Sequence, residues 1–395
     1  MASTTAKKET KFSAFLKKKD IVFSWKRYFI DAMGAMAHGL FASLLIGTIV
    51  GTIGQQILAN CPLGADIAAL GLTDAQLLGK VSELDISFLQ VIGLFLNAMG
   101  TFAKGVAGPA MAVAIAYVLK APNLVLFSML AVGAAANTLG GAGGPLAVLL
   151  IAIIATELGK LVSKETKVDI LVTPLVTIGA GSLLSFLIAP WIGKAASALG
   201  QFIMWATELQ PLLMGILVSV VVGIALTLPI SSAAICAALS LTGLAGGAAV
   251  AGCCAQMVGF AVMSFKENKF GGLISQGIGT SMLQMGNIVR NPKIWIAPIL
   301  TSAITGPLAT CVFKLQMNGA AISSGMGTCG FVGQIGVYTG WVNDIAAGTK
   351  SAITAFDWIG LILISIVLPA VLTLIFGAIE RKLGWIKDGD LNLNS

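Results

Sequence analysis

Residues 209–265 read LQPLLMGILVSVVVGIALTLPISSAAICAALSLTGLAGGAAVAGCCAQMVGFAVMSF and contain no charged side chain. A bilayer core about 30 Å thick is crossed by a helix of roughly 20 apolar residues. The stretch is therefore long enough for two or three membrane spans. The proline and the paired serines at 229–232 lie in the middle of this stretch, which predicts a break between spans.

The rest of the chain has the same character. Of its 395 residues 57% are hydrophobic and only 10% are charged, with a mean hydropathy of +0.93, whereas soluble domains have about 25% charged residues. Eight stretches lack charge, apart from Lys120 in the third; they are 32–65, 86–103, 105–156, 170–193, 209–265, 294–313, 315–343 and 358–379. This pattern predicts an all-α polytopic membrane protein with about ten transmembrane helices, some of which form re-entrant hairpins.

The basic residues predict the orientation, because cytoplasmic segments collect lysine and arginine. Eight of the 24 basic residues precede the first span, in residues 1–31, whereas the segment 66–85 has four acidic residues and one lysine. Arg381, Lys382 and Lys387 follow the last span. Both termini are therefore expected on the cytoplasmic side of the membrane.

The leader, residues 1–31, shows no cleavable signal peptide, because no apolar core follows its first lysines. Its apolar residues recur at helical spacing among lysines, which is typical of an amphipathic helix on the inner leaflet and equally of an ordinary basic flank. Since the net charge of +7 lies beside the spans, membrane lipid is the expected partner and nucleic acid is not.

No metal, cofactor or catalytic group is predicted. The six cysteines form no CxxC pair. Gly325, Gly327 and Gly330 spell G-x-G-x-x-G, but no strand–helix–strand pattern surrounds them, as a dinucleotide site would need. The single histidine, His38, lies near the start of the first span. It could take part in substrate binding or proton transfer, or it could only pack between helices or lie at the membrane interface.

Glycine is abundant, with 47 residues, and part of it clusters with proline. The clusters are GGAGGP at 140–145, TLP at 227–229 and SSGMGTCGFVGQIG at 323–336. Irregular backbone is tolerated within a membrane only where protein buries it or a water-filled cavity adjoins it. These clusters predict broken helices or re-entrant loops, the elements from which transporters build their substrate sites.

Glu208 in WATELQP (205–211) is the only charged residue between Ala195 and Phe265. A carboxylate at membrane depth usually faces a cavity or a partner, although a short amphipathic helix ending at the interface would also explain it. Uncharged polar residues follow it through the C-terminal half, and each fits either a ligand or an interhelical hydrogen bond. The predicted substrate-binding set is Glu208, Gln210, Ser231, Ser232, Gln256, Gln284, Asn287, Ser324, Thr328 and Gln334.

Five segments carry a family resemblance. They are TLPISSAAI (227–235), CCAQMVGFAV (253–262), QGIGTSMLQMGNI (276–288), NPKIWIAPILTSAITGPLAT (291–310) and GMGTCGFVGQIG (325–336). Together they resemble the membrane-integral IIC component (EIIC) of the bacterial phosphotransferase system (PTS), and most of all its stand-alone branch with the PfoR-type proteins, which are named as toxin regulators.

The resemblance implies a homodimer in the inner (plasma) membrane of a bacterium. Its expected parts are a leader at 1–31, a scaffold and dimerisation half at 32–192, a transport half with hairpins at 193–343, and a last helix and tail at 344–395. It makes Glu208 the nearest counterpart of the family's sugar-binding hairpin glutamate. Only Thr207 and Glu208 match the family's Gly-Ile-Thr-Glu motif, and the partner histidine has no counterpart in the C-terminal half.

The expected function is a permease that moves a sugar or a similar small polar solute by alternating access. Neither the leader nor the tail is long enough for a soluble phosphotransfer domain. Phosphorylation would therefore need separate IIA and IIB proteins acting in trans. Two alternatives stay open: a PTS-uncoupled carrier of another small polar or anionic solute, and a membrane sensor or regulator without net transport.

Overall fold

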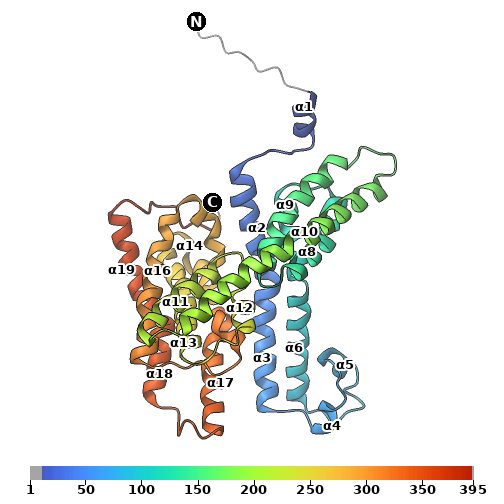
Figure 1. Ribbon diagram of the computed structural model, residues 1–395. Helices are drawn as coiled ribbons and strands as arrows, with labels where there is room; N and C mark the ends of the chain where they lie inside the picture. The colour runs from blue at the N-terminus through green and yellow to red at the C-terminus, as the bar shows by residue number, and fades with distance from the viewer. Residues whose placement is uncertain (1–10, 394–395) are drawn as a thin grey trace.

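The computed structural model describes residues 11–393, which contain helices and no strand (Figure 1). Several helices pass directly into segments with wider π-helical turns. The segments η1 (Lys26–Asp31), α2 (Ala32–Leu40), η2 (Phe41–Leu45) and α3 (Ile46–Asn60) follow one another without a gap and form a single helix, Lys26–Asn60. This helix is called the first long helix below.

The first long helix packs against α6 (Phe88–Gly105) through small residues. A Cβ atom at Gly47 would lie 2.8 Å from the carbonyl oxygen of Gly100, and one at Gly54 would lie 2.5 Å from the backbone nitrogen of Asn97. Such close backbone approach is the way helices associate in lipid, where no hydrophobic force drives them together. The short helices α4 (Ala65–Ala68) and α5 (Asp74–Leu78) join these two long helices at the lower end (Figure 1).

Two further pairs complete the N-terminal half. Helix α6 continues into α7 (Ala107–Val118) across a bend of 48°. Helices α8 (Asn123–Gly140) and α9 (Gly144–Val162) form a hairpin whose turn begins at Gly141, with φ of +52°. Glycine adopts that angle without steric cost, so the sequence GGAGGP turns the chain as expected.

Helix α10 (Asp169–Thr207) connects the two halves. Its 39 residues would extend about 58 Å at 1.5 Å per residue, far longer than one perpendicular crossing. It accordingly runs obliquely across the molecule (Figure 1). Much of its surface is apolar and uncovered by the rest of the chain, as at Leu175 and Phe186.

The C-terminal half is built around α13 (Gly243–Met263), which is buried along nearly its whole length. Helices α11 (Pro211–Thr227), α16 (Ile296–Pro307) and α19 (Leu368–Lys382) pack around it. Shorter helices fill the remaining positions: α12 (Ser232–Ala238), α14 (Phe265–Ile274), α15 (Met285–Arg290), α17 (Val332–Ala346) and α18 (Ala355–Ile362).

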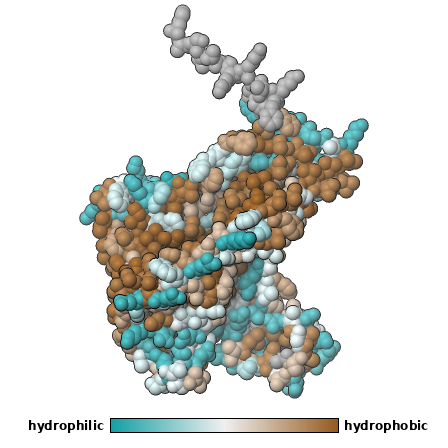
Figure 2. Space-filling view, viewed as in Figure 1, coloured by the Kyte–Doolittle hydropathy of each residue, from teal (hydrophilic) through white to brown (hydrophobic). Residues whose placement is uncertain are grey.

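The prediction of an all-α polytopic membrane protein is confirmed. In the described residues six helical ranges are long and apolar enough to cross a bilayer, or seven if the bent α6–α7 pair is one span. The number is smaller than the roughly ten expected partly because the range Asn123–Val162, which holds the α8–α9 hairpin, counts once. A broken stretch lowers it further, because α11 has only 17 residues and residues 228–231 after it are not helical. Brown apolar surface covers much of the middle of the molecule, where a narrow oblique band of teal crosses it, and hydrophilic colour gathers toward the ends (Figure 2).

A buried ionic cluster ties residues 19–28 to the N-terminal half. The Lys160 side chain is only 1% exposed, and its ammonium group donates to the backbone oxygens of Asp20 and Leu119 at 2.8 and 3.0 Å. Arg27 also donates to the Leu119 oxygen, at 2.7 Å. The leader begins with α1 (Lys11–Lys18), and exposed Phe23 follows it at 78% exposure. Residues 1–10 of the predicted amphipathic leader lie outside the described part, and its position on the inner leaflet stays a prediction.

Candidate functional site

The three glycine and proline clusters meet around one small cavity, called the central cavity. Pro145 from the α8–α9 turn, Leu226 and Ile230 around the TLP break, and Met326 and Cys329 from the third cluster all line it. The backbone nitrogen of Ser231 donates to the oxygen of Ala142 at 2.9 Å, which joins two of the breaks directly. The cavity has a volume of about 60 Å³, enough for about two waters at roughly 30 Å³ each.

The central cavity has a polar side made of hydroxyl groups. Thr48, Ser231, Ser232 and Thr280 line it, and the other lining residues are apolar or glycine. Ser232 Oγ donates to the oxygen of Gly325 at 2.8 Å. Ser231 Oγ accepts from the backbone nitrogen of Ala234 at 3.2 Å, which caps α12. Since each serine hydroxyl has one donor and two acceptor positions, each retains hydrogen-bonding capacity toward the cavity.

A second cavity of about 350 Å³ lies toward the C-terminal residues and is called the tail-side cavity. His38 and Phe41 from the first long helix line it, opposite Asn268, Ser275 and Leu393. His38, Leu283 and Leu393 also border a neighbouring groove of about 970 Å³. His38 therefore faces open space between the two halves.

The ring of Phe41 separates the tail-side cavity from the central cavity. A Cβ atom at Gly279, which lines the central cavity, would lie 2.5 Å from Phe41 Cε2. The ring therefore lies directly against the backbone there, and only glycine leaves room for it.

A third cavity of about 180 Å³ lies on the other side and is called the loop-side cavity. Thr48 and Met326 line both the central and the loop-side cavity. Thr52, Gln55 and Lys104 add polar groups to it. The first long helix thus borders all three cavities in turn, through residues spaced three or four apart, which places them on one helix face. These residues are His38, Phe41, Leu44, Leu45, Thr48, Thr52, Gln55 and Gln56.

Of the predicted substrate-binding residues, the structure brings Ser231 and Ser232 together at the central cavity. Glu208 and Gln210 lie elsewhere: both are exposed, Glu208 immediately after α10 and Gln210 immediately before α11. Neither lines the three cavities. The position of Glu208 at the end of a long exposed helix agrees with the interfacial alternative, and its contact with a solute stays a prediction.

Gln256 is fully buried in α13, where its amide bonds to three neighbours. Trp295 Nε1 donates to Gln256 Oε1 at 2.7 Å, and Thr227 Oγ1 donates to the same oxygen at 3.3 Å. Gln256 Nε2 donates to Ser302 Oγ at 3.4 Å. With both polar atoms engaged, Gln256 connects α11, α13 and α16 as interhelical hydrogen bonds do in membrane proteins.

Ser324, Thr328 and Gln334 also bond within the protein. Ser324 Oγ donates to the oxygen of Leu241 at 2.6 Å, and Thr328 Oγ1 donates to the oxygen of Gly277. Gln334 Nε2 lies 3.2 Å from Cys254 Sγ, while its Oε1 has no partner among the described residues. These contacts hold the third glycine cluster against α13 and η4 (Ser275–Gly279).

Gln284 and Asn287 bind the C-terminal tail, residues 384–393. Gln284 Nε2 donates to the backbone oxygen of Leu391 at 3.0 Å, and Asn287 Nδ2 donates to that of Asn392 at 3.0 Å. The two side chains also bond to each other at 2.8 Å. Leu391 is fully buried. The tail is thus part of the folded body and forms part of the wall of the tail-side cavity.

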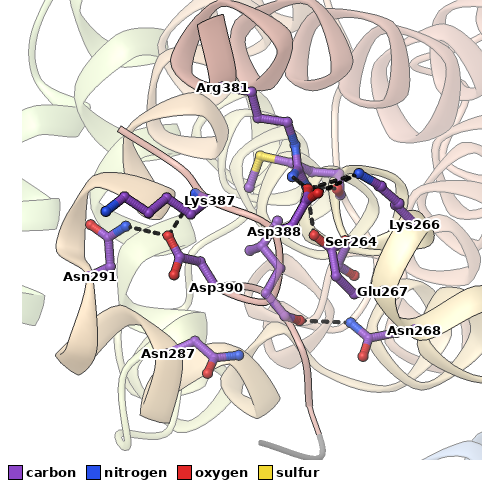
Figure 3. Close-up of polar contacts among 12 residues, drawn as sticks. Ser264, Lys266, Glu267, Asn268, Asn287, Asn291, Arg381, Lys387, Asp388 and Asp390 are labelled. Atoms are coloured by element: carbon purple, nitrogen blue, oxygen red, sulfur yellow. Dashed lines mark hydrogen bonds and ion pairs between the residues drawn. The ribbon is translucent and has the colours of Figure 1, made fainter. Parts of the chain in front are cut away.

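Other side chains hold the same tail (Figure 3). Asn268 Nδ2 donates to the Leu391 oxygen at 2.7 Å, and Asn291 Nδ2 donates to Asp390 Oδ2 at 2.9 Å. The Lys266 ammonium bonds to Asp388 at 2.8 Å, and this contact holds the pKa of that exposed carboxyl below its ordinary value. Together with these side chains, Gln284 and Asn287, which were predicted as solute ligands, fix the C-terminal tail in place.

We expect Gln284→Ala to lower the stability of the folded protein by about 2 kcal/mol, because it leaves buried Gln276 Oε1 without a donor and removes one of the two donors to the Leu391 oxygen. The thermal unfolding midpoint in detergent measures this, and proteolysis at the tail should become faster. Gln201→Ala, at an exposed position of α10, is the matched control and should change neither quantity. Unchanged stability together with weaker solute binding would instead indicate that Gln284 binds the solute.

Several polar lining residues were not in the predicted set, among them Thr48, Thr280 and Lys104. Lys104 had a visible signal, because it separates the charge-free stretches 86–103 and 105–156. Thr48 and Thr280 had no such signal, because an isolated threonine in an apolar segment is equally typical of a residue that packs between helices. In residues 11–393 no group of three or more histidine, cysteine, aspartate or glutamate side chains is placed to hold a metal ion.

The family described as phosphotransferase system, EIIC, matches residues 30–393, nearly the whole chain. The chain belongs to this EIIC family. No curated protein and no solved structure matches it. The match supports a membrane permease for sugar-type substrates and confirms the family resemblance, while the PfoR-like branch stays a prediction.

In an EIIC protein, the row of cavities is a candidate for the place where the solute binds. The three chain breaks, in which backbone groups are free of regular helix bonds, lie at one place between the first long helix and the C-terminal half. Membrane proteins tolerate such breaks where they border a cavity. The central cavity is therefore the best candidate for the solute site of this permease.

Proposed function

We propose that this EIIC chain carries a small polyhydroxylated solute along the row of three cavities, by alternating access. The observation that supports this most strongly is that one face of the first long helix borders all three cavities, while the three chain breaks close around the middle one. Sites at the middle of a transporter, formed by interrupted helices, are the general arrangement of secondary carriers.

The size of the central cavity supports an occluded state. At about 60 Å³ it is smaller than the 300 Å³ or more of ordinary ligand sites. A sugar enters only when the lining segments move apart. Withdrawal of Phe41 from Gly279 would join the central cavity to the tail-side cavity, and separation of Thr48 from Met326 would widen the passage to the loop-side cavity. Opening one of these contacts at a time is alternating access.

The hydroxyl groups supply the recognition chemistry. Thr48, Ser231, Ser232 and Thr280 each donate and accept, as the hydroxyls of a sugar do. Thr48 belongs to the first long helix and the other three to the C-terminal half. A solute bound between them contacts both halves, so relative movement of the halves exposes it to one side and then to the other.

This proposal keeps the expected organisation of the chain. Residues 32–192 act as the scaffold half and 193–343 as the transport half, in a homodimer with both termini in the cytoplasm of a bacterium. The tail-side cavity then opens inward, where separate IIA and IIB proteins could phosphorylate the solute. The α1 end and the C-terminal tail lie at one end of the molecule, opposite α4 and α5 (Figure 1), as this orientation requires.

Uptake into proteoliposomes tests the proposal. Purified protein should accumulate a labelled sugar from a panel of neutral and acidic monosaccharides, and accumulation should fall at least about 10-fold in Ser232→Ala, because hydrogen bonds that hold a solute in a buried site contribute about 1.5 kcal/mol each. Ser240→Ala, at an exposed position after α12, is the control. Specific binding without accumulation would favour the sensor instead, and neither binding nor accumulation would refute the permease.

A further inference from the structure

Among the described residues, no charged side chain lines the central cavity, and one lines the loop-side cavity, that of Lys104. Neither cavity is lined by a described aspartate or glutamate. The tail-side cavity adds His38 as its single titratable group within residues 11–393. The row of cavities therefore has a positive group and no negative one among these lining residues.

Lys104 lies deep in the helical body. It is half-buried, one residue before α6 ends at the 48° bend into α7. Its Nζ atom is 3.6 Å from the position that a Cβ atom at Gly51 would occupy. Gly51 belongs to the interior of the first long helix, so the ammonium group lies at the depth of the spans and not at their ends.

This ammonium group forms no ion pair in the described part of the protein. Among the ion pairs and hydrogen bonds of residues 11–393, none involves the Lys104 ammonium. Asp74 lies on the same side of the molecule, but its carboxylate accepts a hydrogen bond from Asn97 Nδ2 and forms no ion pair with Lys104. An unpaired cation at membrane depth is costly, and such residues usually mark the pathway of a substrate or ion.

We propose that Lys104 binds the anionic group of the solute, so that the cargo is an acidic sugar or a similar polyol with one carboxylate or phosphate. The ammonium group lines the loop-side cavity together with the amides of Gln55 and Gln56, all of which can donate to an anion. Thr48 lines this cavity and the central one alike. A solute that extended past Thr48 from one cavity into the other would place its hydroxyls at the serines and its acidic group at Lys104.

This inference rests on the proposed transport function and narrows its substrate class. It also differs from a purely structural role. A lysine in the last turn of a helix interacts favourably with the helix dipole, and that role would make Lys104 affect stability without distinguishing acidic from neutral solutes.

Binding of matched sugar pairs to the full-length protein separates these possibilities. Isothermal titration with glucose and glucuronate, and with galactose and galacturonate, compares solutes that differ only in the acidic group, and glucose 6-phosphate distinguishes phosphate from carboxylate. We expect an acidic member to bind and its neutral counterpart to bind at least about 10-fold more weakly. Lys104→Gln should raise the Kd of the acidic member about 10- to 100-fold, the range of a charge-assisted hydrogen bond.

Two further variants keep the test decisive. Lys104→Arg preserves the charge and should stay within a few-fold of the wild-type Kd, and exposed Lys80→Gln should not change it. Equal binding of neutral and acidic members, or a Lys104→Gln variant that loses stability but keeps its preference for acids, would overturn this inference while leaving sugar transport intact. Failure of every sugar to bind or accumulate would refute the transport proposal itself.

Discussion

Gly252→Ala should prevent the protein from folding, although alanine usually stabilises a helix by about 1 kcal/mol over glycine. Gly252 lies where α13 crosses α11, and a Cβ atom there would be 1.8 Å from the backbone oxygen of Ser219 and 2.5 Å from its carbonyl carbon. Both neighbours are main chain atoms, so no side chain can rotate away. The two helices would have to separate in the centre of the C-terminal half.

We expect the loss to exceed about 4 kcal/mol, the range of severe core disruption. Size-exclusion chromatography in detergent should show aggregate in place of a monodisperse peak. Gly179→Ala is the matched control, because Gly179 is exposed in the interior of α10, and no atom lies within 4 Å of the position that its Cβ would occupy. That substitution should be neutral or slightly stabilising, and similar behaviour of the two variants would contradict the α11–α13 packing described above.

The sequence predicts the chain breaks well, because their physical signal is local. Glycine and proline clusters within apolar segments require backbone that is not regular helix, and all three clusters border the central cavity. The positive φ values of Gly141, Gly327 and Gly330 show why glycine occupies those turns. The apolar composition likewise predicts membrane spans without reference to any tertiary contact.

The site residues are harder to predict, because a polar side chain at membrane depth has the same sequence signal whether it faces a ligand or a neighbouring helix. Gln256, Gln284 and Asn287 have donors and acceptors within the protein, and only the folded structure shows which atoms meet. Glu208 is prominent in the sequence because it is alone, yet it lies at an exposed helix end.

The tail illustrates the same limit over a longer distance. Residues 384–393 are polar and follow the last span, which in sequence alone is typical of a solvated end. The structure places Leu391 in the interior and bonds the tail to side chains more than 100 positions earlier. Such long-range pairings leave no periodic pattern in the sequence.

Thr48→Trp should reduce transport at least about 100-fold while leaving the protein folded, and it tests the proposed route at its narrowest point. Thr48 lines both the central and the loop-side cavity, and an indole cannot fit a central cavity of about 60 Å³ together with a solute. The ring can instead occupy the loop-side cavity of about 180 Å³, so helix packing is preserved while the passage is filled.

The measurement is uptake of the solute that the proteoliposome assay identifies, with thermal unfolding as the check on folding. Ile53→Trp is the control on the same helix, since Ile53 is 49% exposed and lines none of the three cavities. It should transport at the wild-type rate. If Thr48→Trp carried solute as fast as Ile53→Trp, the solute would have to cross elsewhere, and the face of the first long helix would not be the route. If Thr48→Trp lost transport and Ile53→Trp kept it, the solute would have to pass beside Thr48. The pathway would then lie between the first long helix and the chain breaks of the C-terminal half.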